Sequence, residues 1–439
     1  MRGSMVILGL VIVMASVYAL DTNTVLLTAP ADDSTITTDF NIVWDVNNAN
    51  GDWNHFVVSL SFGTVVENDG DYNVAFITGT DFNTADLNMS HCQADVNDVY
   101  HCSYTQIIDG NFLRNGPFTI KIIGYKTDGN VFESNAVNVT LDHFNEFNAA
   151  VSSLSATGEM NITLSFECDV NTSSASVVLH TPSSGDVSIS IPDVNDANAI
   201  TVTVPTSELT KVVRGTILEL NSGFSSSCAI PNDTNVLVTN LPDAYTYVPA
   251  KQWTAVTIPY VLDENYAYTF QALSEANTVA RYSGGWDTNI TDFYSEAYTF
   301  YGYYFYSESN MWIPLRWSSY YNKSSCKGGN YIALPTGWSF ISVFCLDGGP
   351  SCADSNSSLV TLSFLEVNTT SMEVYKSPIY QFYGIPGSEG TTGTLVSGFG
   401  AIPTVTSASP YWVWINPNWV QNGFTVYYYG ACVSVPNLP

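Results

Sequence analysis

Apolar and polar residues alternate with a period of two along most of this chain. The alternation is clearest in residues 40–44, 55–60, 118–122 and 136–141, where β-branched and aromatic side chains lie between Gly, Asn and Asp. Asp-Gly and Asn-Gly pairs, which favour tight turns, separate such segments. Long stretches with the 3.6-residue period of an amphipathic helix are hard to find. The sequence therefore predicts an all-β protein of many short strands, built as tandem β-sandwiches.

Two interruptions divide the strand pattern. Residues 142–148 (DHFNEFN) form the first, and residues 240–250 (NLPDAYTYVPA), whose prolines break any strand, form the second. After an N-terminal segment, we predict two sandwiches and a larger, aromatic-rich β domain. The predicted ranges are 1–19, 20–141, 142–247 and 248–439.

The first predicted domain resembles an immunoglobulin-like or fibronectin-III-like sandwich. A turn at residues 30–35 precedes the strand Phe40–Trp44, and a hairpin over residues 118–141 turns at Asp128-Gly129. The resemblance implies that Trp44 lies in the core. In the second domain, Cys168 and Cys228 have the separation of an inter-sheet disulfide in such a fold. That domain has no tryptophan, so it resembles a divergent member.

The N-terminus has the pattern of a secretion signal. Arg2 supplies a positive charge, residues 5–14 (MVILGLVIVM) are apolar, and Val17-Tyr18-Ala19 offers a cleavage site. The alternative is a membrane anchor, for which the apolar run is short. We therefore expect cleavage after Ala19, no membrane span and an extracellular location.

The cysteines agree with export, because an even number in an exported chain indicates disulfides. We expect Cys92–Cys102 and Cys168–Cys228, with two bridges among the last four, for which one arrangement is Cys326–Cys345 and Cys352–Cys432. The eight cysteines are Cys92, Cys102, Cys168, Cys228, Cys326, Cys345, Cys352 and Cys432.

Nine Asn-x-Ser/Thr sequons lie along the whole mature chain and predict N-linked glycans in a eukaryotic host. A coat of sugar would explain how a chain with only 12% charged residues stays in solution. The sequon asparagines are Asn88, Asn138, Asn161, Asn171, Asn232, Asn289, Asn322, Asn356 and Asn368.

The charge balance excludes one class of partner. The chain has 12 Lys and Arg against 40 Asp and Glu, for a net charge of −28. So few basic residues cannot form the patch that a nucleic-acid backbone requires, and they disfavour binding to anionic lipid. We expect no nucleic-acid partner.

Metal sites have weak sequence support. His91-Cys92 and His101-Cys102 contain zinc-ligand residue types, but an oxidising compartment favours a disulfide. The acidic turn at residues 67–71 lacks the later residues of a calcium loop. The repeated tetrapeptide Asp-Val-Asn-Asp, at residues 95–98 and 193–196, is typical of a solvated turn. We expect no cofactor; calcium is the one ion that these turns leave open.

Signatures of catalysis are missing from the sequence, which lacks both Gly-x-Ser-x-Gly and His-Glu-x-x-His. Acidic residues do flank an aromatic stretch, at Asp287, Asp292, Glu296 and Glu308, so an exported glycoside hydrolase stays a minor alternative. We expect that the protein is not an enzyme.

Residues 293–317 (FYSEAYTFYGYYFYSESNMWIPLRW) are aromatic on both faces of any strand they form. One face fits a core. The other, with Tyr301, Tyr303 and Phe305, fits an interface with protein or sugar, and the alternative is a strand buried on both faces. Trp412 and Trp414 share one strand face and offer a surface for sugar stacking, with Trp419 beyond a Pro-Asn turn, and the alternative is that these tryptophans lie in a core.

Together these features favour a secreted structural glycoprotein that assembles with copies of itself into an extracellular filament, coat or matrix. The alternative is a carbohydrate-binding adhesin or lectin, whose partner would be an extracellular polysaccharide.

Overall fold

The computed structural model describes most of the chain up to residue 316 and separate strands beyond it. The described ranges are 24–47, 52–70, 72–96, 98–182, 185–231, 234–257, 262–263, 265–282, 285–288, 302–316, 331–334, 337–343, 359–365, 379–382, 393–397, 404–406, 409–415 and 424–428. Strands dominate these residues, which confirms the all-β class. The predicted signal segment 1–19 lies outside them.

Contacts group the chain into two units that exchange short segments. The first unit consists of Met1–Val66, Ala75–Glu146 and Ser226–Thr234. The second consists of Glu67–Val74, Phe147–Ser225 and Asn235–Pro439. The division into three domains stays a prediction.

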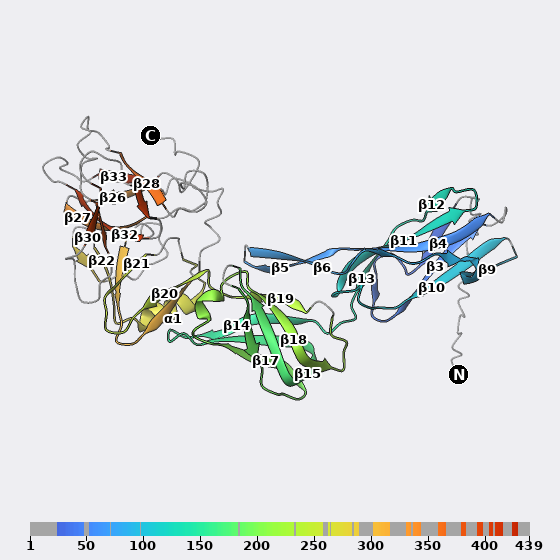
Figure 1. The fold of residues 1–439 in the computed structure, drawn as a ribbon, viewed down its shortest axis with the longest axis horizontal. Coiled ribbons are helices and arrows are strands. Elements are labelled where there is room, and N and C mark those ends of the chain that lie inside the picture. Colours follow the sequence, from blue (N-terminus) through green and yellow to red (C-terminus); the bar gives the residue numbers. More distant parts are fainter. Residues whose placement is uncertain are drawn as a thin grey trace, which may run out of the picture. The chain divides into compact units, whose positions relative to one another are not determined.

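The first unit is an immunoglobulin-like or fibronectin-III-like sandwich of two sheets, drawn in blue to cyan in Figure 1. One sheet has the order β1-β3-β10-β9: Val25–Ala29, Phe40–Asn47, Val99–Gln106 and Cys92–Ala94. The other has the order β2-β13-β11-β4-β7: Ser34–Ile36, Val137–Leu141, Gly116–Lys126, Trp53–Phe62 and Phe82–Asn83. β12 (Val131–Glu133) adds to β11, and β8 (Leu87–Asn88) adds to β4. The short 3-10 helix η1 is Met89–His91.

The core of the first unit follows from the alternation. Every second residue of β3 is buried, among them Ile42 and Trp44, which are fully buried. Trp44 meets Phe56 of the facing sheet edge-on, with 5.5 Å between ring centroids. The resemblance thus placed Trp44 correctly. β1 pairs antiparallel with β3 and forms one edge of its sheet.

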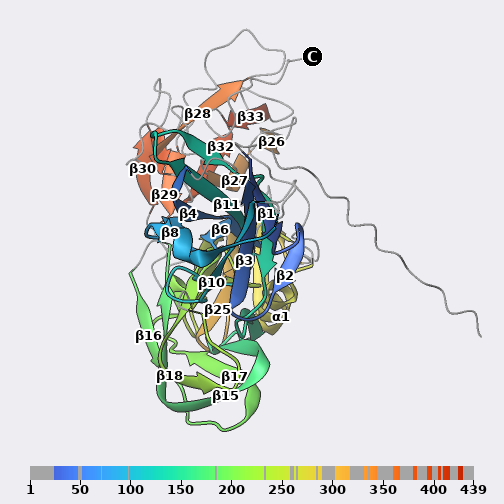
Figure 2. The same cartoon turned by 90° about the vertical axis from the view of Figure 1, so that its right-hand side faces the viewer.

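The second unit contains a six-stranded sheet, drawn in green in Figures 1 and 2. This sheet has the order β14-β19-β18-β15-β16, with β17 beside β15. The bounds are Phe147–Leu154, Asn235–Thr239, Ile217–Ser226, Met160–His180, Val187–Ser190 and Ala197–Val204, and the 3-10 helix η2 is Leu209–Lys211.

The long strand β15 serves two parts of this sheet. Residues 160–165 pair with β14 and β17, whereas residues 176–179 pair with β16. Beside β15, Gly223 has φ +80, and a Cβ there would lie 2.5 Å from the Ser173 carbonyl oxygen. Only glycine fits this close approach of two strands.

The rest of the second unit contains small sheets and α1 (Ala267–Glu275), the one α-helix among the described residues. β20 (Ala244–Val248) pairs with β25 (Met311–Leu315). A four-stranded sheet has the order β21-β24-β22-β23: Thr254–Thr257, Gly302–Tyr306, Thr278–Tyr282 and Trp286–Asp287. Two more sheets have the orders β26-β33-β28-β31 and β27-β32-β29-β30: Tyr331–Leu334, Phe424–Tyr428, Leu359–Leu365, Thr404–Thr406, Gly337–Val343, Ser409–Ile415, Ile379–Phe382 and Gly393–Ser397.

The aromatic strand β24 is buried rather than exposed. Tyr303 and Phe305, which the sequence assigned to a contact surface, are 0% and 1% exposed and pack with Val256 and Ile313. Tyr304, on the opposite face, is also buried, and β24 lies beside β27. The alternative of a strand buried on both faces therefore describes this segment, because its residues on opposite faces are buried alike. Tyr301 lies outside the described residues.

The later aromatic residues lie in the sheet of β27 and β32. Trp412 pairs with Phe340 and with Tyr380, and Trp414 pairs with Trp338. Backbone pairing therefore sets aromatic residues opposite one another on three adjacent strands. Trp419 lies outside the described residues, and a role for these tryptophans in sugar stacking stays a prediction.

We predict that Phe305→Ala lowers the free energy of unfolding by about 3–5 kcal/mol, since it leaves a cavity in a packed core. Thermal and urea unfolding would measure this loss. Trp286→Ala is the control: Trp286 is 59% exposed, so its removal should have a much smaller effect. Equal effects of the two substitutions would mean that Phe305 does not belong to the core.

Candidate functional site

The most unusual polar feature of the structure forms at the end of one hairpin. β5 (Thr64–Asp69) and β6 (Tyr72–Ile77) make a two-stranded sheet. Residues 67–74, which we call the hairpin tip, belong to the second unit. Gly70 adopts φ +71 at the turn, a conformation that favours glycine. Residues 67–71 of the hairpin tip have the acidic start of a calcium loop but lack the later residues of one.

Asp69 of the hairpin tip forms a buried ion pair with Arg316. The Arg316 Nη2 atom donates to Asp69 Oδ1 at 2.7 Å, and both side chains are 8% exposed. Arg214 Nε lies 4.0 Å from Asp69 Oδ2. A carboxylate thus meets two guanidinium groups in a place that water hardly reaches, where their attraction is stronger than at a surface.

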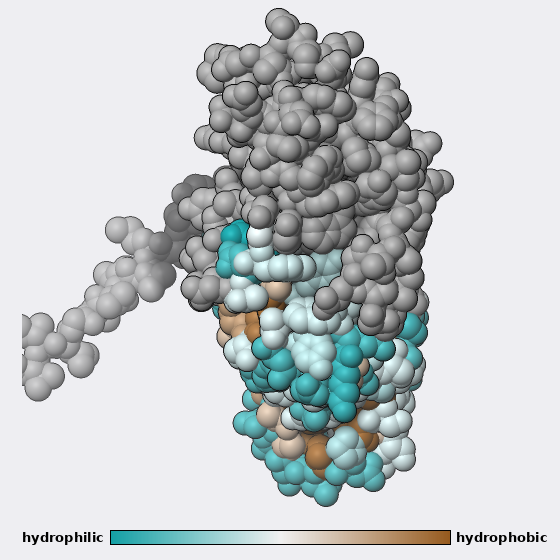
Figure 3. Space-filling view, turned by 90° about the vertical axis from the view of Figure 1, so that its left-hand side faces the viewer, coloured by the Kyte–Doolittle hydropathy of each residue, from teal (hydrophilic) through white to brown (hydrophobic). Residues whose placement is uncertain are grey.

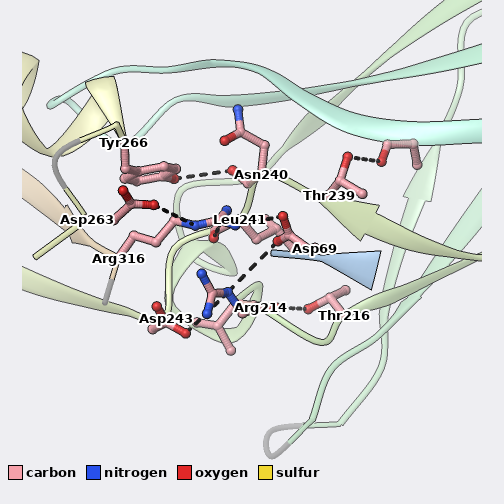
Figure 4. Close-up of polar contacts among 12 residues, drawn as sticks. Asp69, Arg214, Thr216, Thr239, Asn240, Leu241, Asp243, Asp263, Tyr266 and Arg316 are labelled. Carbon is pink, nitrogen blue, oxygen red and sulfur yellow. Dashed lines mark hydrogen bonds and ion pairs between the residues drawn. The ribbon is translucent and has the colours of Figure 1, made fainter. Parts of the chain in front are cut away.

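The rest of the Arg316 side chain is also held (Figure 4). Its Nη1 donates to the Leu241 carbonyl oxygen at 3.1 Å, and its Nε lies 3.8 Å from Asp263 Oδ2. The Tyr266 ring lies 5.3 Å from the guanidinium carbon, a cation–π contact. Burial raises the pKa of Tyr266, whose hydroxyl donates to the Asn240 carbonyl oxygen at 3.3 Å.

Two further contacts fix the hairpin tip. Glu67 Oε2 accepts from the Leu237 backbone N–H at 2.6 Å. Gly215 has φ +91, and a Cβ there would lie 2.5 Å from the Tyr72 hydroxyl oxygen. The positive φ favours glycine at position 215, and a side chain there would displace the Tyr72 ring. We call Arg214, Gly215, Leu237 and Arg316 the tip receptor.

Local structure explains why the arginines point here. Arg316 directly follows β25, and the Asp263 N–H donates to its carbonyl oxygen at 2.8 Å. Arg214 is held by its backbone N–H, which donates to Pro242 at 2.8 Å, and its Nε lies 3.5 Å from Asp243 Oδ1. Each arginine therefore lies near Asp69 of the hairpin tip and near a second carboxylate, which is Asp263 for Arg316 and Asp243 for Arg214.

The chemistry of this cluster suits binding of the hairpin tip rather than catalysis. Guanidinium groups only donate hydrogen bonds and stay charged in proteins, so they cannot act as bases. The raised pKa of Tyr266 keeps its hydroxyl protonated. A buried ion pair costs desolvation free energy but strongly selects one geometry, because an unpaired buried charge is far less stable. The cluster therefore holds the hairpin tip in one place, and we call Asp69, Arg214 and Arg316 the lock.

Sequence reasoning missed both arginines. Their rarity was a usable signal: in a chain with only 12 basic residues, an arginine at the end of an aromatic run is expected to have an acidic partner. The identity of that partner could not be predicted, because Asp69 lies 247 positions from Arg316.

The described cysteines are all oxidised. Cys92 and Cys102 form the predicted disulfide, which joins neighbouring residues of β9 and β10. Cys168 and Cys228 are both disulfide-bonded, as their predicted pairing requires. Cys326, Cys345, Cys352 and Cys432 lie outside the described residues.

Four predicted glycosylation sites lie in the described part of the chain. Asn88 and Asn138 are exposed, and Asn161 and Asn171 are half-buried. The Asn161 Nδ2 atom donates to Ser153 Oγ at 2.9 Å. Occupancy stays a prediction for all nine. Asn232, Asn289, Asn322, Asn356 and Asn368 lie outside the described residues.

Aspartates of the two Asp-Val-Asn-Asp turns accept hydrogen bonds from backbone N–H groups. Asp95 accepts from the Val99 N–H at 2.9 Å, and Asp193 accepts from the Ser174 N–H at 2.8 Å. Among the described residues, no group of three or more His, Cys, Asp or Glu side chains is arranged to hold a metal ion. Within the same ranges, no helix is long and apolar enough to cross a membrane.

Comparisons with known proteins found similar structures but no family. No family model matches the chain, and no curated protein matches it. A structure of fibronectin(III)-like modules of Clostridium thermocellum CbhA is 12% identical, over 49% of this chain and 94% of that chain, with a TM-score of 0.15. A structure of a tetra-tandem repeat in the extending region of a large adhesion protein is 10% identical, over 93% of this chain and 99% of that chain, with a TM-score of 0.20.

We predict that Asp69→Ala lowers the free energy of unfolding of the second unit by about 3–5 kcal/mol, because two buried cations lose a partner. Urea unfolding of the full chain would measure it. The control is Glu133→Ala, which removes an exposed ion pair with Lys121 at 3.3 Å and should cost about 1 kcal/mol or less. A loss no larger than that of the control would contradict the role of the lock.

A second charged cluster makes stability depend on pH. His180 Nε2 lies 2.6 Å from Glu219 Oε2, and its Nδ1 lies 3.0 Å from Asp186 Oδ1. The hydrogen bond with Glu219, followed by that with Asp186, raises the pKa of His180 above 6.5. The protonated histidine thus links β15 to β18 and to the start of β16.

We predict that this link stabilises the protein fully below about pH 6.5, the ordinary pKa of an unfolded histidine, and is lost as pH rises through the raised pKa. Melting temperatures measured between about pH 5 and pH 8 would show the loss. His180→Gln should remove this part of the pH dependence while keeping a polar side chain of similar size. An unchanged slope in that variant would contradict the assignment.

Proposed function

We propose that this protein is a secreted structural glycoprotein whose copies assemble into an extracellular filament, coat or matrix. The observation that carries the proposal is the locked hairpin tip. Buried ion pairs and a partly buried hydrogen bond to the backbone tie residues 67–74 to segments more than a hundred residues later, so the second unit resists opening. Resistance of this kind suits a role in which force, rather than chemistry, acts on the molecule.

The surface and the cysteines support the same proposal. On the face in Figure 3, teal and pale residues cover most of the coloured surface, and brown residues form small separate spots. Disulfides and exposed sequon asparagines such as Asn88 and Asn138 suit an extracellular life.

A second candidate function is carbohydrate binding, which exposed aromatic rings favour. Trp286 is 59% exposed beside Tyr304, and Tyr247 is 40% exposed with its ring centroid 4.6 Å from that of Trp312. Flat exposed rings of this kind can stack on sugars.

We predict that electron microscopy of the glycosylated protein, over a dilution series, shows regular filaments or sheets that dissociate on dilution. Monomers at every concentration would contradict the proposed assembly. Monomers that bind a glycan array, and that lose this binding on Trp286→Ala, would support carbohydrate binding instead.

A further inference from the structure

The hairpin tip and its receptor have complementary chemistry. The tip presents the carboxylates of Glu67 and Asp69 and the ring of Tyr72. The tip receptor provides the guanidinium groups of Arg214 and Arg316 and the backbone N–H of Leu237. Its Gly215 leaves room for the Tyr72 ring. Two of the chain's 12 basic residues are used here, although copies with a net charge of −28 otherwise repel one another.

The stem of the hairpin, residues 64–66 and 75–77, belongs to the first unit and has exposed apolar side chains. Val66 is 54% exposed and Ile77 is 57% exposed. Within the described ranges, β5 and β6 pair only with each other, so both edges of this ribbon lack a neighbouring strand. A two-stranded sheet is marginally stable alone, and open edges are sites where another strand can add.

We propose that, in the assembled protein, the tip receptor binds the hairpin tip of a second copy of this chain. An identical tip makes the same ion pairs and the same Glu67–Leu237 hydrogen bond, so the exchange loses no contact that the single chain has. It gains the burial of stem residues such as Val66 and Ile77 between neighbouring ribbons. Because each copy has one tip and one receptor, exchange in one direction joins copies head to tail into a filament.

This inference rests on the proposed assembly and names the segment that joins the copies. The partner is a second copy, rather than another protein, because the receptor fits residues that this chain itself carries. The other occupant, the tip of the same chain, is the alternative that the test distinguishes.

The test is photo-cross-linking with isotope-mixed copies. Tyr72 is replaced by p-benzoylphenylalanine, which keeps an aromatic ring at the contact with Gly215. Chains labelled with ¹⁵N and unlabelled chains are mixed in equal amounts as monomers, allowed to assemble and irradiated. Mass spectrometry then identifies the isotope content of each tip peptide joined to a receptor peptide.

We expect about half of the cross-links in the assembled fraction to join a ¹⁵N peptide to an unlabelled one, as random exchange between copies requires. Assemblies whose cross-links join only peptides of the same isotope would overturn the inference and leave the proposed assembly standing. If no assembly forms, both fail.

A second position protects the test against a misfit of the larger side chain. Asn68 is an exposed residue between Glu67 and Asp69, so the same cross-linker at position 68 disturbs no packing. Hybrid cross-links from position 68 support the exchange, and same-isotope cross-links alone contradict it. Asp69→Ala in the same background is the control, and it should reduce tip-to-receptor cross-links of either kind.

Discussion

The ion pair between Asp69 and Arg316 is the interaction on which the second unit most depends. Moving either charge out of water is costly, and their attraction offsets that cost only at close range and with the remaining hydrogen-bonding atoms satisfied. Arg316 meets these conditions through Asp69, the Leu241 carbonyl oxygen and Asp263. All three contacts require β25, the segment after β19 and the hairpin tip to be in place together. The pair therefore makes the folding of distant segments cooperative.

The placement of charge explains the composition of the chain. Several of its few basic side chains are used inside the structure: Arg214 and Arg316 in the lock, and Lys126, which is 4% exposed and lies 3.0 Å from Asp52. Few cations remain to wet the surface, which then depends on neutral polar groups, carboxylates and the predicted glycans. Surfaces with a large excess of negative charge repel one another. Any association between copies would therefore need contacts with locally complementary charges.

The aromatic strand shows how tyrosine can build a core between layers. Tyr303 and Phe305 pack with the aliphatic residues below β24, and Tyr304 faces the other side. A strand that is covered on both faces has no polar face, so its sequence no longer alternates. Interfaces and two-sided cores therefore look the same in sequence, and only the presence of a covering layer distinguishes them.

The sequence by itself determined the all-β class, the core position of Trp44 and the Cys92–Cys102 disulfide, because each depends on local pattern or on residues only 10 positions apart. It predicted the turn at Gly70 for the same reason. It did not predict α1, whose nine residues are too few for a clear helical period. The tertiary structure alone decided that Tyr303 and Phe305 are buried and that Asp69 meets Arg316 and Arg214. Those outcomes depend on which layers and segments come together across the chain, and no local pattern of residues encodes that choice.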